Sequence, residues 1–282
     1  MKVTNKYGMP EVFRERMEAL HNSHDRGEGA EYSVTELLKP PQVLALERRY
    51  ELEVDCTHLV DAAIGTGFHR AMENPGLSTS EIRLSAVFAK IRISGQIDWL
   101  VGGVIFDFKT GKVAYANQES VHVKPEWEQQ LNLYALLCEC NGLTVKGANI
   151  IVAYKDHSEF KKYGKSYPEC PAQVLSVRMW SHQERVDFAK GRIKLHESCK
   201  FLGDRGLPEC TQEERWQSDP GYAVMKKGAS RATRVCSTIN EAFAAMPNTK
   251  DYFVERRESK PKRCCERFCP AIKVCHQARR GK

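Results

Sequence analysis

Two strand-like runs joined by Gly102-Gly103 restrict the fold of this chain more than any other feature. Residues 90–101 and 104–109 each alternate with a period of two, as a strand with one buried face requires. A two-glycine connection is typical of a tight antiparallel hairpin, because both turn residues adopt positive φ. Any fold for this chain must therefore contain this strand pair.

The hairpin carries charges where its neighbours are apolar. Asp98 interrupts one apolar run, while Asp107 and Lys109 alternate with Phe106 and Phe108 in the other. The turn places position 98 opposite position 107, so two carboxylates would stand side by side, which is unfavourable without a counter-ion. Lys109 balances only one of them. Either the hairpin has a solvated face with an incidental salt bridge, or the carboxylates hold a divalent metal; charges that interrupt apolar runs favour the metal.

Such a site suits metal-assisted hydrolysis of phosphodiesters. The two carboxylates would hold Mg²⁺ or Mn²⁺, and the ion would polarise a phosphate. Lys109 would orient or deprotonate the attacking water.

The elements around the hairpin predict an α/β fold. We expect a capped helix that starts at Ser33 and is interrupted at Pro40-Pro41, helices over 57–74, 125–141 and 183–201, and further strands over 81–88, 148–154 and 173–180. Short meander strands followed by a crossover helix are typical of a compact α/β domain. Residues 1–32 are polar with one weak helical stripe, so we expect a flexible N-terminal arm there.

Composition restricts the class of protein. The chain has 43 Lys and Arg against 36 Asp and Glu, a net charge of +7, and 41% hydrophobic residues, which exclude a disordered chain. No apolar run approaches the roughly 18 residues of a membrane span, and the polar start lacks a signal-peptide core. We therefore expect a soluble cytoplasmic protein without a membrane partner.

The cysteines gather at the C-terminal end. Four of the eleven, Cys264, Cys265, Cys269 and Cys275, fall in the last nineteen residues, and an odd number in a reducing compartment argues against a disulfide framework. The end therefore resembles a metal site, and its spacing does not separate an iron–sulfur cluster from zinc held by four cysteines.

Four ordered motifs resemble a known family. They are Gly65-Thr-Gly-Phe-His69, Gly95-Gln-Ile-Asp98, Asp107-Phe-Lys109-Thr-Gly and Gln130-Leu-Asn-Leu-Tyr134. Their order and approximate spacing are similar to those of the RecB-like branch of the PD-(D/E)XK nucleases, particularly phage-encoded, exonuclease-like members. The resemblance implies a restriction-endonuclease-like core over residues 33–203, with a mixed central sheet flanked by helices. Helical and Cys-rich additions over 204–282 would close onto that core.

The resemblance also implies roles for individual residues. His69, Asp98, Asp107 and the backbone carbonyl of Phe108 would bind the metal, and Lys109 would be the catalytic lysine. Gln130 and Tyr134, four apart on one helix face, would position the lysine or a DNA phosphate. Helix packing is the alternative role for both.

For the cysteines, the resemblance is to RecB-like nucleases that carry a [4Fe-4S] cluster. In those proteins three C-terminal cysteines and one distant upstream cysteine pin the chain end onto the nuclease domain. Here this implies Cys210, Cys265, Cys269 and Cys275, with structural zinc as the alternative and with Cys56 or Cys264 as alternatives to Cys210. The C-x3-C-x5-C spacing departs from the commonest C-x2-C-x5-C.

The resulting hypothesis is a Mg²⁺- or Mn²⁺-dependent DNA exonuclease of phage or bacterial recombination, repair or DNA degradation. Its substrate would be DNA that is single-stranded or has free ends, and its partner a single-strand annealing or recombination protein. Basic clusters over 155–165, 226–227, 231–234, 256–267 and 279–282 fit phosphate contacts. The alternatives are a structure-specific endonuclease or nickase of the same fold, and a non-catalytic DNA-binding recombination partner.

Overall fold

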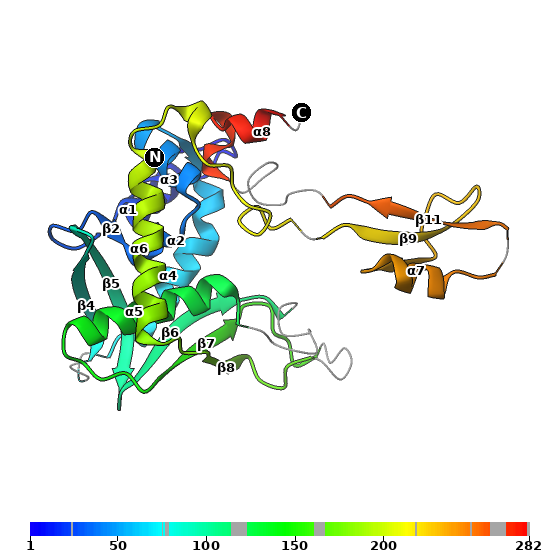
Figure 1. Cartoon of the computed structure of the whole chain (residues 1–282). Helices are drawn as coiled ribbons and strands as arrows, with labels where there is room; N and C mark the ends of the chain where they lie inside the picture. The colour runs from blue at the N-terminus through cyan, green and yellow to red at the C-terminus, as the bar shows by residue number, and fades with distance from the viewer. Residues whose placement is uncertain are drawn as a thin grey trace. The chain divides into compact units, whose positions relative to one another are not determined.

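The structure, a computed structural model, describes the 282-residue chain except residues 24, 75, 77, 78, 114–122, 161–166, 218, 249, 260–268 and 281–282. The chain divides into two compact units, Met1–Phe201 and Leu202–Lys282, and their helices and strands are labelled in Figure 1. No helix among the described residues is long and apolar enough to cross a membrane.

A mixed sheet forms the centre of the first unit. Its six described strands are β2 (Tyr32–Ser33), β4 (Ser80–Phe88), β5 (Ile91–Val101), β6 (Val104–Gly111), β7 (Gly147–Tyr154) and β8 (Ala172–Val177). The order is β2-β5-β6-β7-β8, with β4 also paired to β5; the β2/β5 and β6/β7 pairs are parallel and the others antiparallel. The predicted hairpin is confirmed: Trp99 pairs with Phe106, and Gly102 and Gly103 have φ of 60° and 84°.

Helix α5 (Pro125–Cys140) supplies much of the core of the first unit. It lies between β6 and β7 in the sequence, as the parallel pairing of these strands requires. It contacts β4, β5 and β6 and also α2 (Val34–Leu38) and α6 (His182–Cys199), so every residue from Leu131 to Cys138 is buried. The stretch of α5 from Leu131 to Cys138 is therefore buried on all sides, whereas its first turns are polar.

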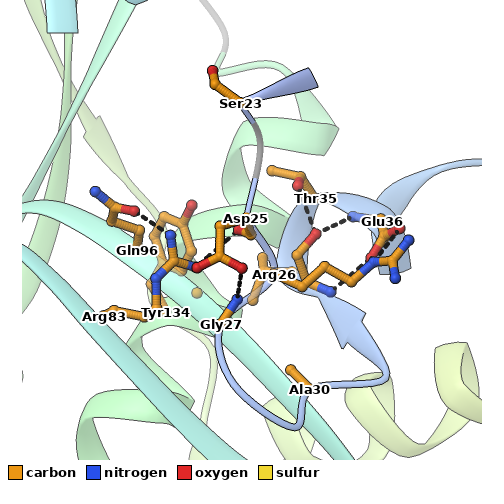
Figure 2. A pocket seen from close by; sticks show the side chains of 13 residues that line it. Ser23, Asp25, Arg26, Gly27, Ala30, Thr35, Glu36, Arg83, Gln96 and Tyr134 are labelled. Carbon is orange, nitrogen blue, oxygen red and sulfur yellow. Dashed lines mark hydrogen bonds and ion pairs between the residues drawn. The ribbon is translucent and has the colours of Figure 1, made fainter. Parts of the chain in front are cut away.

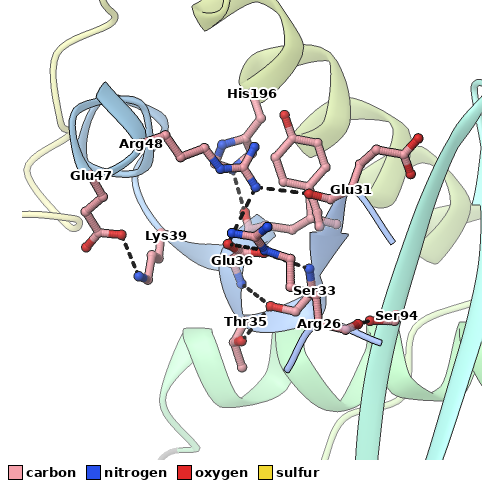
Figure 3. A network of polar contacts seen from close by, with 12 residues as sticks. Arg26, Glu31, Ser33, Thr35, Glu36, Lys39, Glu47, Arg48, Ser94 and His196 are labelled. Atoms are coloured by element: carbon pink, nitrogen blue, oxygen red, sulfur yellow. Dashed lines mark hydrogen bonds and ion pairs between the residues drawn. The ribbon is translucent and has the colours of Figure 1, made fainter. Parts of the chain in front are cut away.

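Local sequence signals fix the helix ends around the sheet. Ser33 and Glu36 form the predicted capping box of α2, and Pro41 starts α3 (Pro41–Arg49) after the interruption. Glu36 also accepts hydrogen bonds from Arg26 and Arg48, which ties the chain before β2 to α2 and α3 (Figure 3). The elements predicted between residues 33 and 201 thus form, with ends within about three residues of those expected.

The helix expected to begin at Thr57 starts differently. A 3₁₀ turn, η1 (Cys56–Leu59), precedes α4 (Val60–Met72), and the residue that caps the turn is Asp55. The Asp55 carboxylate accepts hydrogen bonds from the Thr57 amide at 3.0 Å and the Thr57 hydroxyl at 2.7 Å. Thr57 is therefore a donor to the cap rather than the cap itself.

The N-terminal residues form regular structure where the sequence predicted a flexible arm. Strand β1 (Lys2–Thr4) pairs in parallel with β3 (Glu53–Asp55), and Val3 is buried. Helix α1 (Glu11–Asn22) contacts η1 and α4, and Asp55 accepts a hydrogen bond from the Lys6 amide at 2.6 Å. These contacts join residues about fifty apart, which a local hydrophobic pattern does not reveal.

The second unit contains a small antiparallel sheet that the sequence did not predict. Its described strands are β9 (Gly221–Lys226), β10 (Arg234–Cys236) and β11 (Tyr252–Arg257), in the order β10-β9-β11. Helix α7 (Ile239–Ala245) packs on it through Ala242, against Val224 and Cys236. The 3₁₀ turns η3 (Asp204–Gly206) and η5 (Pro270–Lys273) and helix α8 (His276–Arg280) complete the described elements.

A buried histidine on α6 couples the stability of the first unit to pH. His196 is 3% exposed, and its Nε2 lies 3.0 Å from the Leu37 carbonyl oxygen (Figure 3 shows its position). Burial, reinforced by the nearby Arg192 guanidinium, lowers the pKa of His196 to about 4. The hydrogen bond to the Leu37 carbonyl opposes this shift, but burial outweighs it, so the folded state favours the uncharged imidazole.

We predict that acid weakens the fold through this residue. Between about pH 6.5 and pH 4 the unfolded chain binds a proton that the folded chain rejects, so stability falls as pH is lowered, by about 2 kcal/mol at pH 5. Urea unfolding at pH 7 and pH 5 measures it. His196→Gln keeps an N–H donor without the titration and should lose less stability between these pH values; an equal loss in both proteins would contradict the assignment.

Candidate active site

The two carboxylates of the hairpin lie inside the protein. Asp98 on β5 is 6% exposed and Asp107 on β6 is 2% exposed. The Phe108 amide donates a hydrogen bond to Asp98 Oδ2 at 2.7 Å, so a side chain of β5 accepts from the backbone of β6. The structure therefore brings Asp98 and Asp107 to neighbouring positions in low-dielectric surroundings, where both negative charges are costly.

Asp107 is only partly compensated. Lys109 Nζ lies 2.5 Å from Asp107 Oδ2 as an ion pair, yet Oδ2 accepts no hydrogen bond of regular geometry from any described residue. Burial raises the pKa of Asp107, Asp98 raises it further, and Lys109 opposes both. A divalent cation beside these oxygens would offset the burial and the repulsion together.

His69 reaches the carboxylates from the last turn of α4. Its Nδ1 lies 3.2 Å from Asp98 Oδ2, and this contact raises the pKa of His69. Aromatic packing holds the helix end in place: Phe108 makes edge-to-face contacts with Phe68 at 5.8 Å and Trp99 at 4.8 Å between ring centroids. The Trp99 indole also donates to the Met72 carbonyl at 3.1 Å.

Glu81 on β4 belongs to this group and was missed by the sequence analysis. One ligand atom from each of His69, Glu81 and Asp98 lies within 4.8 Å of the other two. Burial raises the pKa of Glu81, and the nearby Asp98 carboxylate adds to the increase. The site thus offers three carboxylates and an imidazole.

The position of Glu81 depends on the turn between β4 and β5, which the sequence does not indicate. Ala89 and Lys90 have φ of 49° and 69° and form the two-residue connection of a hairpin, which places position 81 opposite position 98. Neither residue is one that such turns normally prefer, so the sequence did not indicate a tight register. Glu81 itself has φ of 55°, an uncommon backbone conformation for a non-glycine residue.

Two polar residues extend from Glu81 into a cavity. Gln96 Nε2 donates to the Glu81 carboxylate. The Arg83 guanidinium donates to Gln96 Oε1 and to the Asp25 carbonyl (Figure 2). The cavity is about 730 Å³ and is lined by Ser23, Asp25, Arg26, Gly27, Ala30, Ser33, Val34, Thr35, Glu36, Arg83, Gly95, Gln96 and Tyr134. Gln96 therefore both contacts the carboxylate site and lines the cavity.

Gln130 and Tyr134 approach the carboxylates from α5, and Tyr134 also lines the cavity. Gln130 Nε2 donates to the Tyr134 hydroxyl at 2.8 Å and lies 3.4 Å from Asp107 Oδ1. Tyr134 is 5% exposed, and burial raises the pKa of its hydroxyl well above its usual range. Tyr134 thus packs in the core, as the packing alternative expected, while Gln130 contacts the Asp107 carboxylate; positioning of the lysine or of a DNA phosphate stays a prediction.

The described cysteines of the C-terminal end are buried in the second unit. Cys210, Cys269 and Cys275 are at most 6% exposed, and the Gln277 side chain bonds the Cys210 amide at 2.9 Å and its carbonyl at 3.0 Å. Cys210 therefore lies beside the start of α8, which directly follows Cys275. Cys264 and Cys265, with 161–165, 260–267 and 281–282 of the predicted basic clusters, lie outside the described residues.

Comparison with known proteins identifies the family. The family model of the PD-(D/E)XK nuclease superfamily matches residues 32–276. The chain belongs to this superfamily. Its mixed sheet with flanking helices agrees with the restriction-endonuclease-like core expected from the sequence.

One solved structure that matches is the crystal structure of SSO0001. It is 17% identical, with a TM-score of 0.44, and the match covers 68% of this chain and 88% of that chain. No curated protein matches.

The absence of a side chain at Gly95 lets the Tyr134 ring pack against β5, and a substitution there tests this contact. A Cβ at position 95 would lie 2.7 Å from the Tyr134 ring and 3.0 Å from Leu137, so Gly95→Ala forces the ring away from β5. We expect a loss of about 1–3 kcal/mol in the free energy of unfolding, measured in urea. Gly191→Ala on α6 is the matched control, because nothing lies within 4 Å of its Cβ. Equal stability of the two variants would contradict this packing.

Proposed function

We propose that this chain is a metal-dependent DNA exonuclease that hydrolyses phosphodiester bonds. Its superfamily is one of nucleases. The observation that carries the proposal is the buried pair Asp98 and Asp107, with Lys109 at 2.5 Å from Asp107 and His69 at 3.2 Å from Asp98. No packing requirement explains two buried carboxylates beside each other, whereas metal binding does.

The donor set fits Mg²⁺ or Mn²⁺. Asp98 and Glu81 offer carboxylate oxygens close to a His69 ring nitrogen, and these are ligands that hard cations and Mn²⁺ accept. Asp107 and the Phe108 carbonyl are the further oxygen ligands that the family resemblance implies. Asp107 Oδ2 lies 2.5 Å from Lys109 Nζ but has no hydrogen bond of regular geometry among the described residues, so a cation at this oxygen would share it with the lysine. When bound, the ion polarises the scissile phosphate and stabilises the charge that develops on it.

The protein side chains have separate tasks around that phosphate. The Lys109 ammonium, held against Asp107, orients the attacking water for in-line displacement. The Phe108 amide fixes Asp98 through one oxygen, and Gln130 restrains Asp107 Oδ1 and Tyr134. Gln96 and Arg83 hold Glu81 from the cavity side, so the carboxylates keep their places before the substrate arrives.

Attack from a DNA end is the finer part of the proposal. It rests on the resemblance to phage exonucleases. By the same resemblance, the protein would act in the cytoplasm in phage or bacterial recombination, repair or DNA degradation. Its partner would be a single-strand annealing or recombination protein. A structure-specific endonuclease or nickase uses the same site. Closed circular DNA separates them, because an exonuclease leaves it intact.

We predict that isosteric removal of one charge abolishes cleavage. Asp107→Asn should lower the rate on end-labelled linear DNA with Mg²⁺ or Mn²⁺ by at least about 100-fold, since it removes a metal ligand and the partner of Lys109. Asp187→Asn on the exposed side of α6 is the matched control and should retain the wild-type rate. Full activity of Asp107→Asn would refute the proposed site. Absence of cleavage by the wild-type protein with either metal would instead favour a non-catalytic DNA-binding role.

We further propose that Cys210, Cys265, Cys269 and Cys275 hold a [4Fe-4S] cluster, with structural zinc as the alternative, and that the segment closes onto the nuclease core. Support comes from burial of the three described cysteines and from the Gln277 side chain, which holds Cys210 beside the start of α8, directly after Cys275. Cys56, whose thiol lies 3.8 Å from Asn5 Oδ1 in the first unit, and Cys264 stay the alternatives to Cys210.

Anaerobically purified protein distinguishes the two cofactors. We expect a brown protein with broad absorption near roughly 400 nm and with iron and sulfide in equal amounts. Cys210→Ser should lose the colour, whereas Cys170→Ser, at an exposed cysteine of the first unit, should keep it. A colourless protein that contains stoichiometric zinc would show that the cofactor is zinc and not an iron–sulfur cluster.

A further inference from the structure

One end of the small sheet in the second unit is strongly basic. The connection from the end of β9 to the start of β10, residues 226–234, contains Lys226, Lys227, Arg231 and Arg234 and no acidic residue. All four side chains belong to exposed residues. We call this segment the basic hairpin tip.

Backbone hydrogen bonds give the basic hairpin tip a defined shape. The Lys227 amide donates to the Asp251 carbonyl at 2.7 Å, and the Thr233 amide donates to the Val224 carbonyl at 2.8 Å. The Ala229 amide closes a turn on the Lys226 carbonyl at 3.0 Å, and Gly228 supplies the positive φ of 79° that this turn needs. The cations are therefore mounted on a folded loop.

The charges of the tip are not neutralised within the protein. Among the residues that the structure describes, no carboxylate forms an ion pair with Lys226, Lys227, Arg231 or Arg234. The opposite end of the same sheet differs, because Arg256 pairs with Glu258 at 3.0 Å and Arg257 with Glu255 at 3.4 Å. Grouped, unpaired cations repel one another, and a polyanion removes that cost.

The strand register places two of these cations on one side of the sheet. Arg234 pairs with Val224, and Lys226 stands two residues further along β9, so both side chains leave the same face about 7–8 Å apart. Gly228, Ala229, Ser230 and Ala232 are small, which leaves room for a phosphate backbone to approach. No aromatic residue lies in 226–234 to stack on bases.

From these observations we propose that the basic hairpin tip binds the phosphate backbone of DNA, independently of base sequence, as a contact in addition to the carboxylate site. The identity of the polyanion as DNA rests on the proposed function, whereas the binding surface does not. Each phosphate neutralised by a lysine or arginine releases counterions, so this contact contributes to affinity and to its salt dependence.

Binding measured without catalysis tests the proposal. The full-length chain is titrated onto labelled linear duplex DNA in EDTA over a range of salt concentrations. The variant K226Q/K227Q/R231Q/R234Q should bind at least about 10-fold more weakly, and the slope of log affinity against log salt should fall in magnitude by about 2–4, near 0.9 per lost phosphate contact. Its urea unfolding curve should match that of the wild type, because the substituted side chains are exposed.

A matched pair of double variants controls for net charge. K227Q/R231Q removes two charges from the tip, and K190Q/K194Q removes two from exposed positions on α6. We expect a weaker affinity and a smaller salt slope for the first and wild-type values for the second. Unchanged affinity and slope in the quadruple variant, or equal losses in both double variants, would overturn the proposal.

Cleavage separates this inference from the proposed function. With Mg²⁺ and saturating short oligonucleotide, the quadruple variant should cleave at the wild-type rate, because the carboxylate site is untouched. If the wild-type chain cleaves no DNA but the variant still loses affinity and slope, the proposed nuclease activity fails and the DNA contact stands. If both proteins cleave and bind alike, the DNA contact fails and the nuclease stands.

Discussion

The hydrogen bond from the Phe108 amide to Asp98 Oδ2, 2.7 Å long and buried, connects the backbone of β6 to the side chain of β5 at the point where the candidate site begins. One oxygen of Asp98 is thereby fixed by the fold, and its contact with His69 ties the end of α4 to the same carboxylate. The Phe108 ring adds the aromatic contacts that hold α4 in place. The backbone and ring of Phe108 and the carboxylate of Asp98 thus determine where the site can form.

The electrostatic balance of the site follows from this arrangement. Asp98, Asp107 and Glu81 carry three acidic groups against Lys109 and His69, in partly or fully buried positions. Protein groups alone compensate the carboxylates incompletely, as the raised pKa values of Asp107 and Glu81 indicate. The small net positive charge of the chain conceals this local acidity, and the basic hairpin tip lies in the other unit.

The sequence predicted those parts of the fold that depend on short-range patterns. The glycine turn at 102–103 set the register of Asp98 and Asp107, and Pro125 and the apolar residues after it marked α5. Glu81 was not predicted because its position depends on a turn through Ala89 and Lys90, and these residue types do not indicate a tight turn.

Long-range contacts account for the other differences. Strand β1 pairs with β3 about fifty residues away, and β9 lies between β10 and β11 in a sheet whose short strands carry weak patterns. A local pattern shows which residues prefer burial but not what buries them. The four ordered motifs were informative because the structure places one residue of each, His69, Asp98, Asp107 and Gln130, in one small region.

Direct measurement of metal binding tests the central claim, that the buried carboxylates exist to hold a divalent cation. Mn²⁺ binding to the full-length protein, followed by electron paramagnetic resonance without DNA, should reveal saturable binding that Asp107→Asn weakens by about 10-fold or more. Glu81→Gln should weaken it as well, whereas Asp187→Asn on α6 should bind as the wild type does. Saturable binding that is identical in all four proteins, or no binding in the wild type, would contradict the account.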